Sequence, residues 1–466
     1  MVSLFSRRKK PRVVVLGLDC AGPQLVFDAF KADLPVMSKL ASEGTWGRLE
    51  SCIPCITVPA WASMLSSRDP GVIGVYGFRN RPDHSYRKMT TADGAAIKVK
   101  RVWDYVGEAG KQSMVMGVPQ TYPVRPLNGH LISDFLTPNS ESAFTYPAIL
   151  KSEVLNLAPN YPFDVKDFRT EDKSGLLQRI YDLTETQFKV AQHNMKTKPW
   201  DFFMWVNMGT DRIHHGFWRY YDPQHRLYEP GNALETAIRD YYRAVDGMIG
   251  KLIELIDDAV LLIVSDHGVT RMDGGICINE WLWRSGWLAL KNTPTEGQIV
   301  AFDESNVDWE RTKAWASGGY YGRVFLNVQG REPQGVIPAD AYEAVCDELA
   351  AAIRAIPDDK GQALKTQVFK PKDIYSQVGN IAPDLIVYFG DLHWRSVGSL
   401  GHGKHFTLEN DTGPDDANHD THGMFILHDG KGRGRVEGHQ LMDIAPTLLN
   451  RMGLTIPAEM QGKIIG

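Results

Sequence analysis

A short apolar run that ends in charged residues constrains this chain most. Residues 260–264 read Val-Leu-Leu-Ile-Val, and Asp266 and His267 follow one residue later. So short and unbroken an apolar run is typical of a strand buried on both faces, as in a parallel sheet. Open α/β sheets bind ligands beyond the carboxyl ends of their strands, so Asp266 and His267 are candidate ligand-binding residues. A carboxylate and an imidazole are together typical ligands of a borderline metal such as zinc.

Two further apolar runs have acids or imidazoles close behind them. Asp19 directly follows the run 13–18, and Asp211 and His215 come a few residues after the run 202–208. Asp211 and His215 are four residues apart, so one helical turn would present both on the same face. Taken singly, each feature has a plainer interpretation: Asp19 suits a helix N-cap, and Asp211 with His215 suits a surface pair.

Four histidines lie in the polar, glycine-rich segment 399–422, which we expect to be a loop between two strands. They are His402, His405, His419 and His422. If one of them joins the groups behind the three strands, about six ligands converge on one edge of a parallel sheet. Six is close to the number that two metal ions need when positions stay open for a substrate.

Thr57 is the candidate nucleophile. Pro59 suits the first turn of a helix, which places Thr57 just before that helix begins. Unpaired backbone N–H groups and the positive end of the helix dipole at that place favour a phosphoryl group, although Thr57 also suits a plain N-cap. A hydroxyl is a poor nucleophile at neutral pH, and binding to a metal ion would favour its alkoxide.

The length, net charge and cysteine content of the chain indicate which class of protein to expect. A chain of 466 residues is long enough for one large domain with additions, and its net charge of -5 argues against binding of a nucleic-acid polymer. No apolar run approaches the ~18 residues of a transmembrane helix. The basic run Arg7 to Lys10, read as a solvated tail rather than a membrane contact, precedes an apolar run too short for a signal peptide. Five cysteines are few and odd in number, so we expect a cytoplasmic protein.

The motifs in this order resemble the alkaline phosphatase superfamily, and within it the type I phosphodiesterase/nucleotide pyrophosphatase-like branch. They are Gly17-Leu18-Asp19, the segment 57–63, the segment 211–218, Asp266-His267-Gly268, His419 with Gly423, and the closing segment 453–462. The resemblance implies a three-layer αβα sandwich with a largely parallel central sheet and a smaller inserted α/β cap subdomain. We expect a basic tail over 1–11, a catalytic domain over 12–290 and 384–466, and the inserted cap over 291–383.

The resemblance also implies two sets of metal ligands, for two divalent ions. One set is Asp19, Thr57, Asp266 and His267; the other is Asp211, His215 and His419. Zinc is the default ion for such ligands, and manganese is the alternative. His422 and His402 are alternatives to His419, which is preferred for its spacing to Gly423. Asn80 is a candidate ligand of a substrate phosphate oxygen.

The implied activity is hydrolysis of a phosphodiester, a nucleotide pyrophosphate or a phosphomonoester through a phosphothreonine-type intermediate. A phosphomutase or phosphotransferase of the same fold is the main alternative, and a binding protein without catalysis is the other. A sulfatase is disfavoured because Ile56 stands where the C-x-P-x-R motif beginning at Cys52 needs arginine. The expected partner is a small-molecule phosphate ester. The sequence does not determine the physiological substrate, the ester class or the oligomeric state.

Overall fold

A ten-stranded, mostly parallel sheet is the centre of the molecule. The computed structural model describes residues 12–466, so the basic run Arg7 to Lys10 lies outside the described residues. The order across the sheet is β20-β2-β19-β9-β1-β8-β5-β6-β7, and β21 pairs with β2. The strands are β1 (Val13–Leu18), β2 (Thr45–Glu50), β5 (Ser113–Met116), β6 (Gly129–Ile132), β7 (Thr145–Tyr146), β8 (Phe202–Asn207), β9 (Val260–Val264), β19 (His422–His428), β20 (Gly434–Arg435) and β21 (His439–Gln440).

The three apolar runs form adjacent parallel strands in the middle of this sheet. β1 lies between β8 and β9, and Val15 is aligned with Met204 on one side and with Leu262 on the other. Every residue of the three strands is buried, which is why their sequences are continuously apolar. β19 runs antiparallel between β9 and β2. The prediction of buried parallel strands is confirmed.

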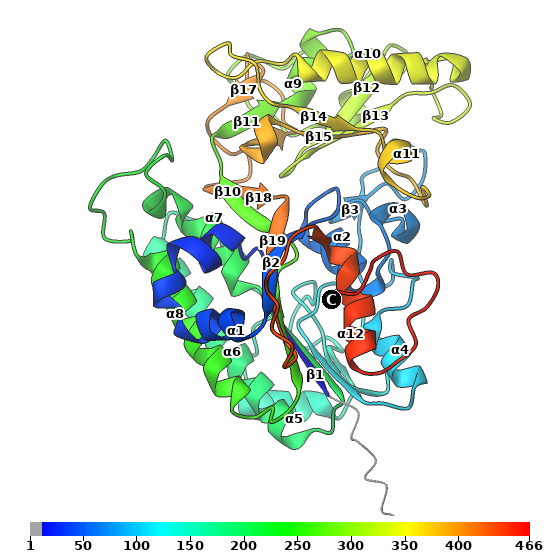
Figure 1. The fold of residues 1–466 in the computed structure, drawn as a ribbon. Coiled ribbons are helices and arrows are strands. Elements are labelled where there is room, and N and C mark those ends of the chain that lie inside the picture. The colour runs from blue at the N-terminus through cyan, green and yellow to red at the C-terminus, as the bar shows by residue number, and fades with distance from the viewer. Residues whose placement is uncertain (1–11) are drawn as a thin grey trace, which may run out of the picture.

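Helices cover both faces of the sheet and complete a three-layer arrangement (Figure 1). One face carries α1, α5, α6, α7 and α8, and the other carries α2, α4 and α12. Their bounds are α1 (Pro35–Glu43), α2 (Thr57–Ser66), α4 (Val102–Glu108), α5 (Leu150–Leu157), α6 (Lys173–Thr197), α7 (Gly209–Tyr221), α8 (Ala237–Ile253) and α12 (Ile444–Arg451). The short helix α3 (Pro70–Ile73) follows α2.

A smaller unit lies at one end of the sheet, at the top of Figure 1. Its four-stranded sheet has the order β12-β13-β15-β14, and a three-stranded sheet β16-β11-β17 lies beside it. The elements are β11 (Gly274–Cys277), α9 (Ile278–Arg284), β12 (Ala314–Ser317), β13 (Gly322–Leu326), α10 (Tyr342–Arg354), β14 (Gln367–Phe369), α11 (Pro371–Ile374), β15 (Leu385–Tyr388), β16 (Trp394–Val397) and β17 (Phe406–Thr407). Its hydrophobic core runs from Ile276 to Trp394, so it extends on both sides of 291–383, the limits expected for the cap. Those limits stay a prediction.

Two segments differ from the sequence-based expectation. Residues 138–183 have no clear hydrophobic periodicity, which favours an irregular surface segment, yet they contain α5 and the first part of α6, a 25-residue helix. The segment 399–422 is not all loop, because β18 (Ala417–Asp420) pairs with β10 (Gly268–Arg271). Between residues 12 and 466, no helix is both long and apolar enough to cross a bilayer.

Packing of the central strands predicts that alanine substitution of two isoleucines lowers the free energy of unfolding by very different amounts. Ile263 in β9 is fully buried, whereas Ile149 is 77% exposed. Ile263→Ala removes three carbons from a dense core, so we expect it to lower the free energy of unfolding by about 2 to 5 kcal/mol. Ile149→Ala is the control, with an expected change within about 0.5 kcal/mol. Urea denaturation measures both, and equal effects would contradict the assignment of β9 to the core.

Candidate metal centre

Seven side chains from five parts of the chain meet where the central strands end toward the smaller unit. Each is at most 3% exposed. Asp19 follows β1, and Asp266 and His267 follow β9; Asp211 and His215 lie on α7 after β8, Thr57 is the first residue of α2, and His419 lies in β18. The structure thus brings together every residue that was predicted to bind metal. Their roles stay predictions.

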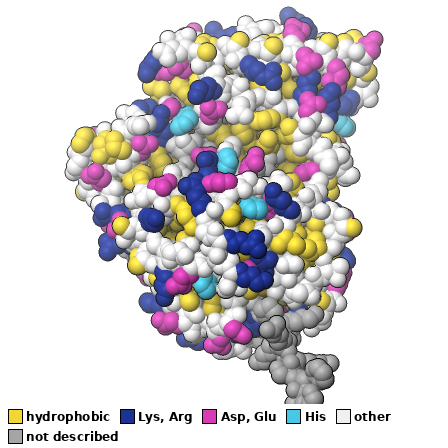
Figure 2. Space-filling view, in the orientation of Figure 1, with side chains coloured by type: hydrophobic (Ala, Val, Ile, Leu, Met, Phe, Trp, Pro, Cys, Tyr) yellow, Lys and Arg dark blue, Asp and Glu magenta, His cyan; other side chains and the backbone are white. Residues whose placement is uncertain are grey.

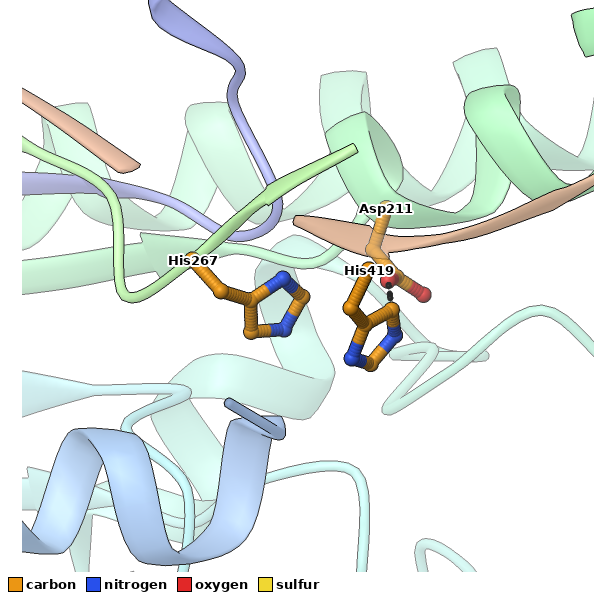
Figure 3. A group of neighbouring side chains, drawn as sticks. All are labelled: Asp211, His267 and His419. Carbon is orange, nitrogen blue, oxygen red and sulfur yellow. Dashed lines mark ion pairs between the residues drawn. The ribbon is translucent and has the colours of Figure 1, made fainter. Parts of the chain in front are cut away.

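Distances divide the cluster into two neighbouring groups that share His267. In one group Nε2 of His267 lies 3.2 Å from Asp266 Oδ2 and 3.8 Å from Asp19 Oδ1. The other group contains Asp211, His267 and His419, with 3.8 Å between Asp211 Oδ1 and His419 Nε2 (Figure 3). In each group the potential ligand atoms lie within 4.8 Å of one another.

His215 and Thr57 extend these two groups. Nε2 of His215 is 3.2 Å from Asp211 Oδ1, as expected for residues four apart on α7. The Oγ1 atom of Thr57 is 3.4 Å from His267 Nε2. The hydroxyl therefore lies beside the imidazole that both groups share.

The atoms that face the middle of the cluster are buried and lack hydrogen-bond partners. They are Asp19 Oδ1, Asp211 Oδ1, His215 Nε2, Asp266 Oδ2 and His419 Nε2. Buried polar atoms are nearly always paired, because an unpaired one loses its hydration without compensation. Three carboxylate oxygens and two imidazole nitrogens left unpaired in one place fit the donor set of divalent cations.

Each imidazole is fixed through its other nitrogen. Nδ1 of His215 is 2.7 Å from Asp415 Oδ1, Nδ1 of His419 is 3.0 Å from the carbonyl of Cys55, and Nδ1 of His267 is 3.0 Å from the carbonyl of Gly268. An Nδ1–H that donates to such an acceptor leaves the Nε2 lone pair free. This is the arrangement by which proteins orient histidines toward a metal.

Each carboxylate is likewise held by its outer oxygen. Trp61 Nε1 donates to Asp19 Oδ2 over 2.7 Å, and the backbone N–H of Cys20 donates to Asp266 Oδ1 over 3.2 Å. The guanidinium of Arg212 donates to Asp211 Oδ2. One oxygen of each acid is therefore left for another partner.

Burial and mutual repulsion shift the titration of these acids. Burial, followed by the charges of Asp266 and Asp211, raises the pKa of Asp19 well above its usual range, and burial also raises the pKa of Asp266. Burial would raise the pKa of Asp211 too, but the charges of His215 and Arg212 outweigh it and hold that pKa well below its usual value. Asp19 and Asp266 are closely spaced acids that resist ionisation together, which is a physical signature of a site for cations.

The histidines respond in opposite directions. Burial lowers the pKa of His215, but Asp415 and Asp211 outweigh burial and raise it to about 9. Burial and the neighbouring His267 lower the pKa of His419 well below its usual value, which favours the neutral form that binds metal.

Thr57 has little freedom of position. The loop before it is held by tyrosines of the smaller unit, since Tyr388 accepts from the N–H of Cys55 over 2.8 Å and Tyr375 donates to the carbonyl of Ile53 over 2.5 Å. Helix α2 begins at Thr57, and because Pro59 has no N–H and the N–H of Ala60 donates to Ile56, its first turn offers the N–H groups of Thr57 and Val58. The smaller unit and α2 together fix the candidate nucleophile.

The other sequence-based candidates lie outside the cluster or bond elsewhere. The amide of Asn80 bonds to the backbone of Tyr76 and Gly77 in its own turn. His422 Nδ1 lies 3.0 Å from Thr421 Oγ1, and His402 Nε2 lies 2.9 Å from Ser399 Oγ. Among the described residues, neither histidine belongs to a group that could hold a metal.

Sequence reasoning did not identify the residues that orient the ligands. Asp415 contacts His215, and it also accepts from Arg169 over 3.0 Å and from the hydroxyl of Tyr320 over 2.9 Å. Tyr320 stacks on His215 with ring centroids 4.8 Å apart. Trp61 carries a usable signal, because it lies one helical turn after Thr57; Asp415 and Tyr320 carry none, because only long-range contacts bring them to the cluster.

The chain was compared with known protein families, curated sequences and solved structures. The model of the family described as type I phosphodiesterase / nucleotide pyrophosphatase matches residues 13–424. A search of curated protein sequences gave no match.

Solved structures share the fold at low sequence identity. A phosphonoacetate hydrolase from Sinorhizobium meliloti, in complex with phosphonoformate, is 14% identical with a TM-score of 0.59, over 95% of this chain and 96% of that one. Human ectonucleotide pyrophosphatase / phosphodiesterase 5 is 14% identical with a TM-score of 0.52, over 96% of both chains. The murine protein in complex with AMP is 13% identical, has a TM-score of 0.53 and likewise covers 96% of both chains. The alkaline phosphatase-like fold expected from the motifs is confirmed.

The raised pKa of His215 predicts how the metal-free protein responds to pH. The pKa of His215 is about 9 in the folded protein and about 6.5 in the unfolded chain. Protonation of His215 therefore stabilises the folded protein fully below pH 6.5, and this stabilisation is lost as the pH rises to 9. Between pH 6.5 and 9, we expect the free energy of unfolding of the metal-free wild type to fall by about 3 kcal/mol more than that of His215→Gln. Urea denaturation after chelation measures the difference, and parallel pH profiles would contradict the charge state assigned to His215.

Proposed function

Because the chain belongs to the type I phosphodiesterase / nucleotide pyrophosphatase family, we propose that it is a two-metal hydrolase of phosphoric esters with Thr57 as its nucleophile. One observation carries the proposal. Five buried ligand atoms from distant segments face one another without partners, with the hydroxyl of Thr57 beside them. Packing alone gives no reason to gather unpaired acids in this way.

Two divalent cations fit these residues. Asp19, Asp266, His267 and Thr57 would hold one, and Asp211, His215 and His419 would hold the other. When bound, the cations would neutralise phosphoryl charge and favour the ionised form of the Thr57 hydroxyl. Zinc suits this mixture of carboxylate and imidazole ligands best.

The residues of the chain supply nucleophile and orientation. Thr57 Oγ1 forms a bond to phosphorus as the bond from phosphorus to the departing alcohol oxygen breaks, and the Thr57 proton leaves with the released alcohol. Water then attacks the phosphothreonine, restores the Thr57 hydroxyl and releases phosphate or a phosphate monoester. The N–H groups at the start of α2 face the phosphoryl oxygens and stabilise their charge.

Small anionic ligands in related folds support this substrate class. The phosphonoacetate hydrolase was captured with phosphonoformate and the murine phosphodiesterase with AMP.

Hydrolysis and transfer to another alcohol differ in one product. Reaction in ¹⁸O-labelled water places label in the released phosphate only if water is the acceptor.

Thr57 provides the direct test of the nucleophile. Thr57→Ala removes the attacking oxygen, so we expect kcat on 4-nitrophenyl phosphate mono- or diesters to fall by at least about 10³-fold. Thr57→Ser keeps a hydroxyl and should retain measurable turnover. Circular dichroism and metal analysis check that both variants stay folded and loaded. A Thr57→Ala variant within tenfold of wild type would end the nucleophile assignment.

Two histidines close in sequence provide a matched test of the second metal. We expect two divalent ions per wild-type chain and only one in His419→Ala, because His419 Nε2 is one of the unpaired inward atoms. His422→Ala is the control and should keep both ions, since that ring bonds to Thr421 instead. Elemental analysis after gel filtration gives the stoichiometry. Loss of an ion in His422→Ala with retention in His419→Ala would reverse the assignment.

A further inference from the structure

A cationic pocket of about 710 Å³ opens beside the metal centre, between the smaller unit and the segment 79–89. Six of its lining side chains are cationic and two are acidic; the acids are Glu304 and Asp411. The cations are Arg79, Arg81, Arg87, Lys88, Arg169 and Arg395. We call this cavity the arginine pocket. So strong an excess of positive charge in a concave site attracts anions.

Several of these cations already have acidic partners. Arg81 pairs with Glu332 over 3.0 Å, Arg169 pairs with Asp415 over 3.0 Å, and Arg87 lies 3.6 Å from Asp83. These three contribute to the field in the pocket, but their charges are partly compensated within the protein.

Arg395 differs because it is buried and two of its nitrogen atoms form no hydrogen bond. It lies in β16 and is only 5% exposed, and its Nε and Nη1 atoms have no hydrogen-bond partner. Its ion pair is with Asp411, whose Oδ1 atom lies 3.8 Å from Nη2 of Arg395. This distance is too long for a hydrogen bond. A guanidinium stays charged at all physiological pH values, so a buried one whose nitrogens lack hydrogen bonds to an anion is costly.

The pocket lies one aromatic ring away from the metal ligands. The guanidinium carbon of Arg395 is 5.7 Å from the centroid of the Tyr320 ring, and that centroid is 4.5 Å from the ring of His419. Gly319, which precedes Tyr320, lines the pocket and exchanges two backbone hydrogen bonds with Ser396. The separation between Arg395 and the metal ligands is therefore one that a short molecule could span.

A second cavity also borders Arg395, but its charge does not suit an anion. This cavity of about 220 Å³ is lined by three arginines, Arg219, Arg226 and Arg395, and by four acidic residues, Glu171, Glu409, Asp415 and Asp416. Asp416 already pairs with Arg219 over 2.7 Å. The excess of carboxylates there would repel an anion, so the larger, cationic pocket is the place where Arg395 would find a partner.

We propose that the arginine pocket binds a second anionic group of the substrate, a carboxylate or a further phosphate, which pairs with Arg395. The inference rests on the proposed function, because the reacting phosphate lies at the metal centre. The substrate class is then a phosphoric ester whose alcohol part carries its own negative charge within about one ring's length of the ester. A guanidinium recognises either group through paired, charge-assisted hydrogen bonds.

Non-hydrolysable phosphonates test this substrate class without turnover. Calorimetry on the metal-loaded protein compares phenylphosphonate with 4-carboxyphenylphosphonate and 1,4-phenylenediphosphonate. We expect the two doubly anionic ligands to bind about 10- to 100-fold more tightly than phenylphosphonate. The carboxylate and phosphonate arms show which second anion is preferred. Equal binding of all three would overturn this inference and leave the hydrolase proposal standing, whereas no binding of any would overturn both.

Two variants test whether Arg395 is responsible. In Arg395→Gln, the doubly anionic ligands and phenylphosphonate should bind with affinities that differ by no more than about threefold. Arg311→Gln is the control, with the same change of charge at a side chain that is 77% exposed and outside the pocket, and it should keep the preference. If Arg395→Gln does not fold, Arg395→Lys decides, because a several-fold loss of preference supports the assignment. An unchanged preference in a folded Arg395 variant would overturn it.

Discussion

Repulsion among buried carboxylates is the constraint on which the rest of this structure depends. Asp19, Asp211 and Asp266 lie at the ends of three adjacent parallel strands, within a dry edge of the protein. Each has one oxygen in a hydrogen bond and one that faces the other acids without a partner. Outer hydrogen bonds hold the acids in place, and the charges of His215 and Arg212 compensate that of Asp211. The inner charge of Asp19 and Asp266 remains, and a pair of divalent cations would compensate it.

Helix α2 links the orientation of a ligand to the position of the nucleophile. Thr57 and Trp61 are one turn apart, so the residue that holds Asp19 and the residue that would attack phosphorus move together. Gly17 makes room for this contact, since a Cβ there would lie 2.6 Å from Trp61. The close approach of α2 to β1 is therefore part of the proposed site as well as of the core.

The smaller unit contacts both the loop before Thr57 and the residues around the metal centre. Its tyrosines hold the loop before Thr57, and its Tyr320 packs against His215 and His419. In Figure 2 hydrophobic side chains gather where the upper lobe meets the lower one, while charges of both signs are spread over the rest of that face. Residues 318–319, 395–396 and 398–399 of the same unit line the arginine pocket. Variation in this unit would thus change substrate choice without altering the strands that carry the acids.

The sequence by itself determined the central strands and the groups at their ends. Continuous apolar runs predict buried parallel strands, and residues just after such strands, Asp19 and Asp266 among them, share one edge whatever the rest of the chain does. Only the tertiary structure distinguished the position of His419 from those of His422 and His402, because the pairing of β18 with β10 brings His419 opposite Val269. Asp415, Tyr320 and Arg395 likewise acquire their partners through contacts between distant segments. Local pattern encodes burial and direction along a strand, but not which loops fold back onto the strand's end.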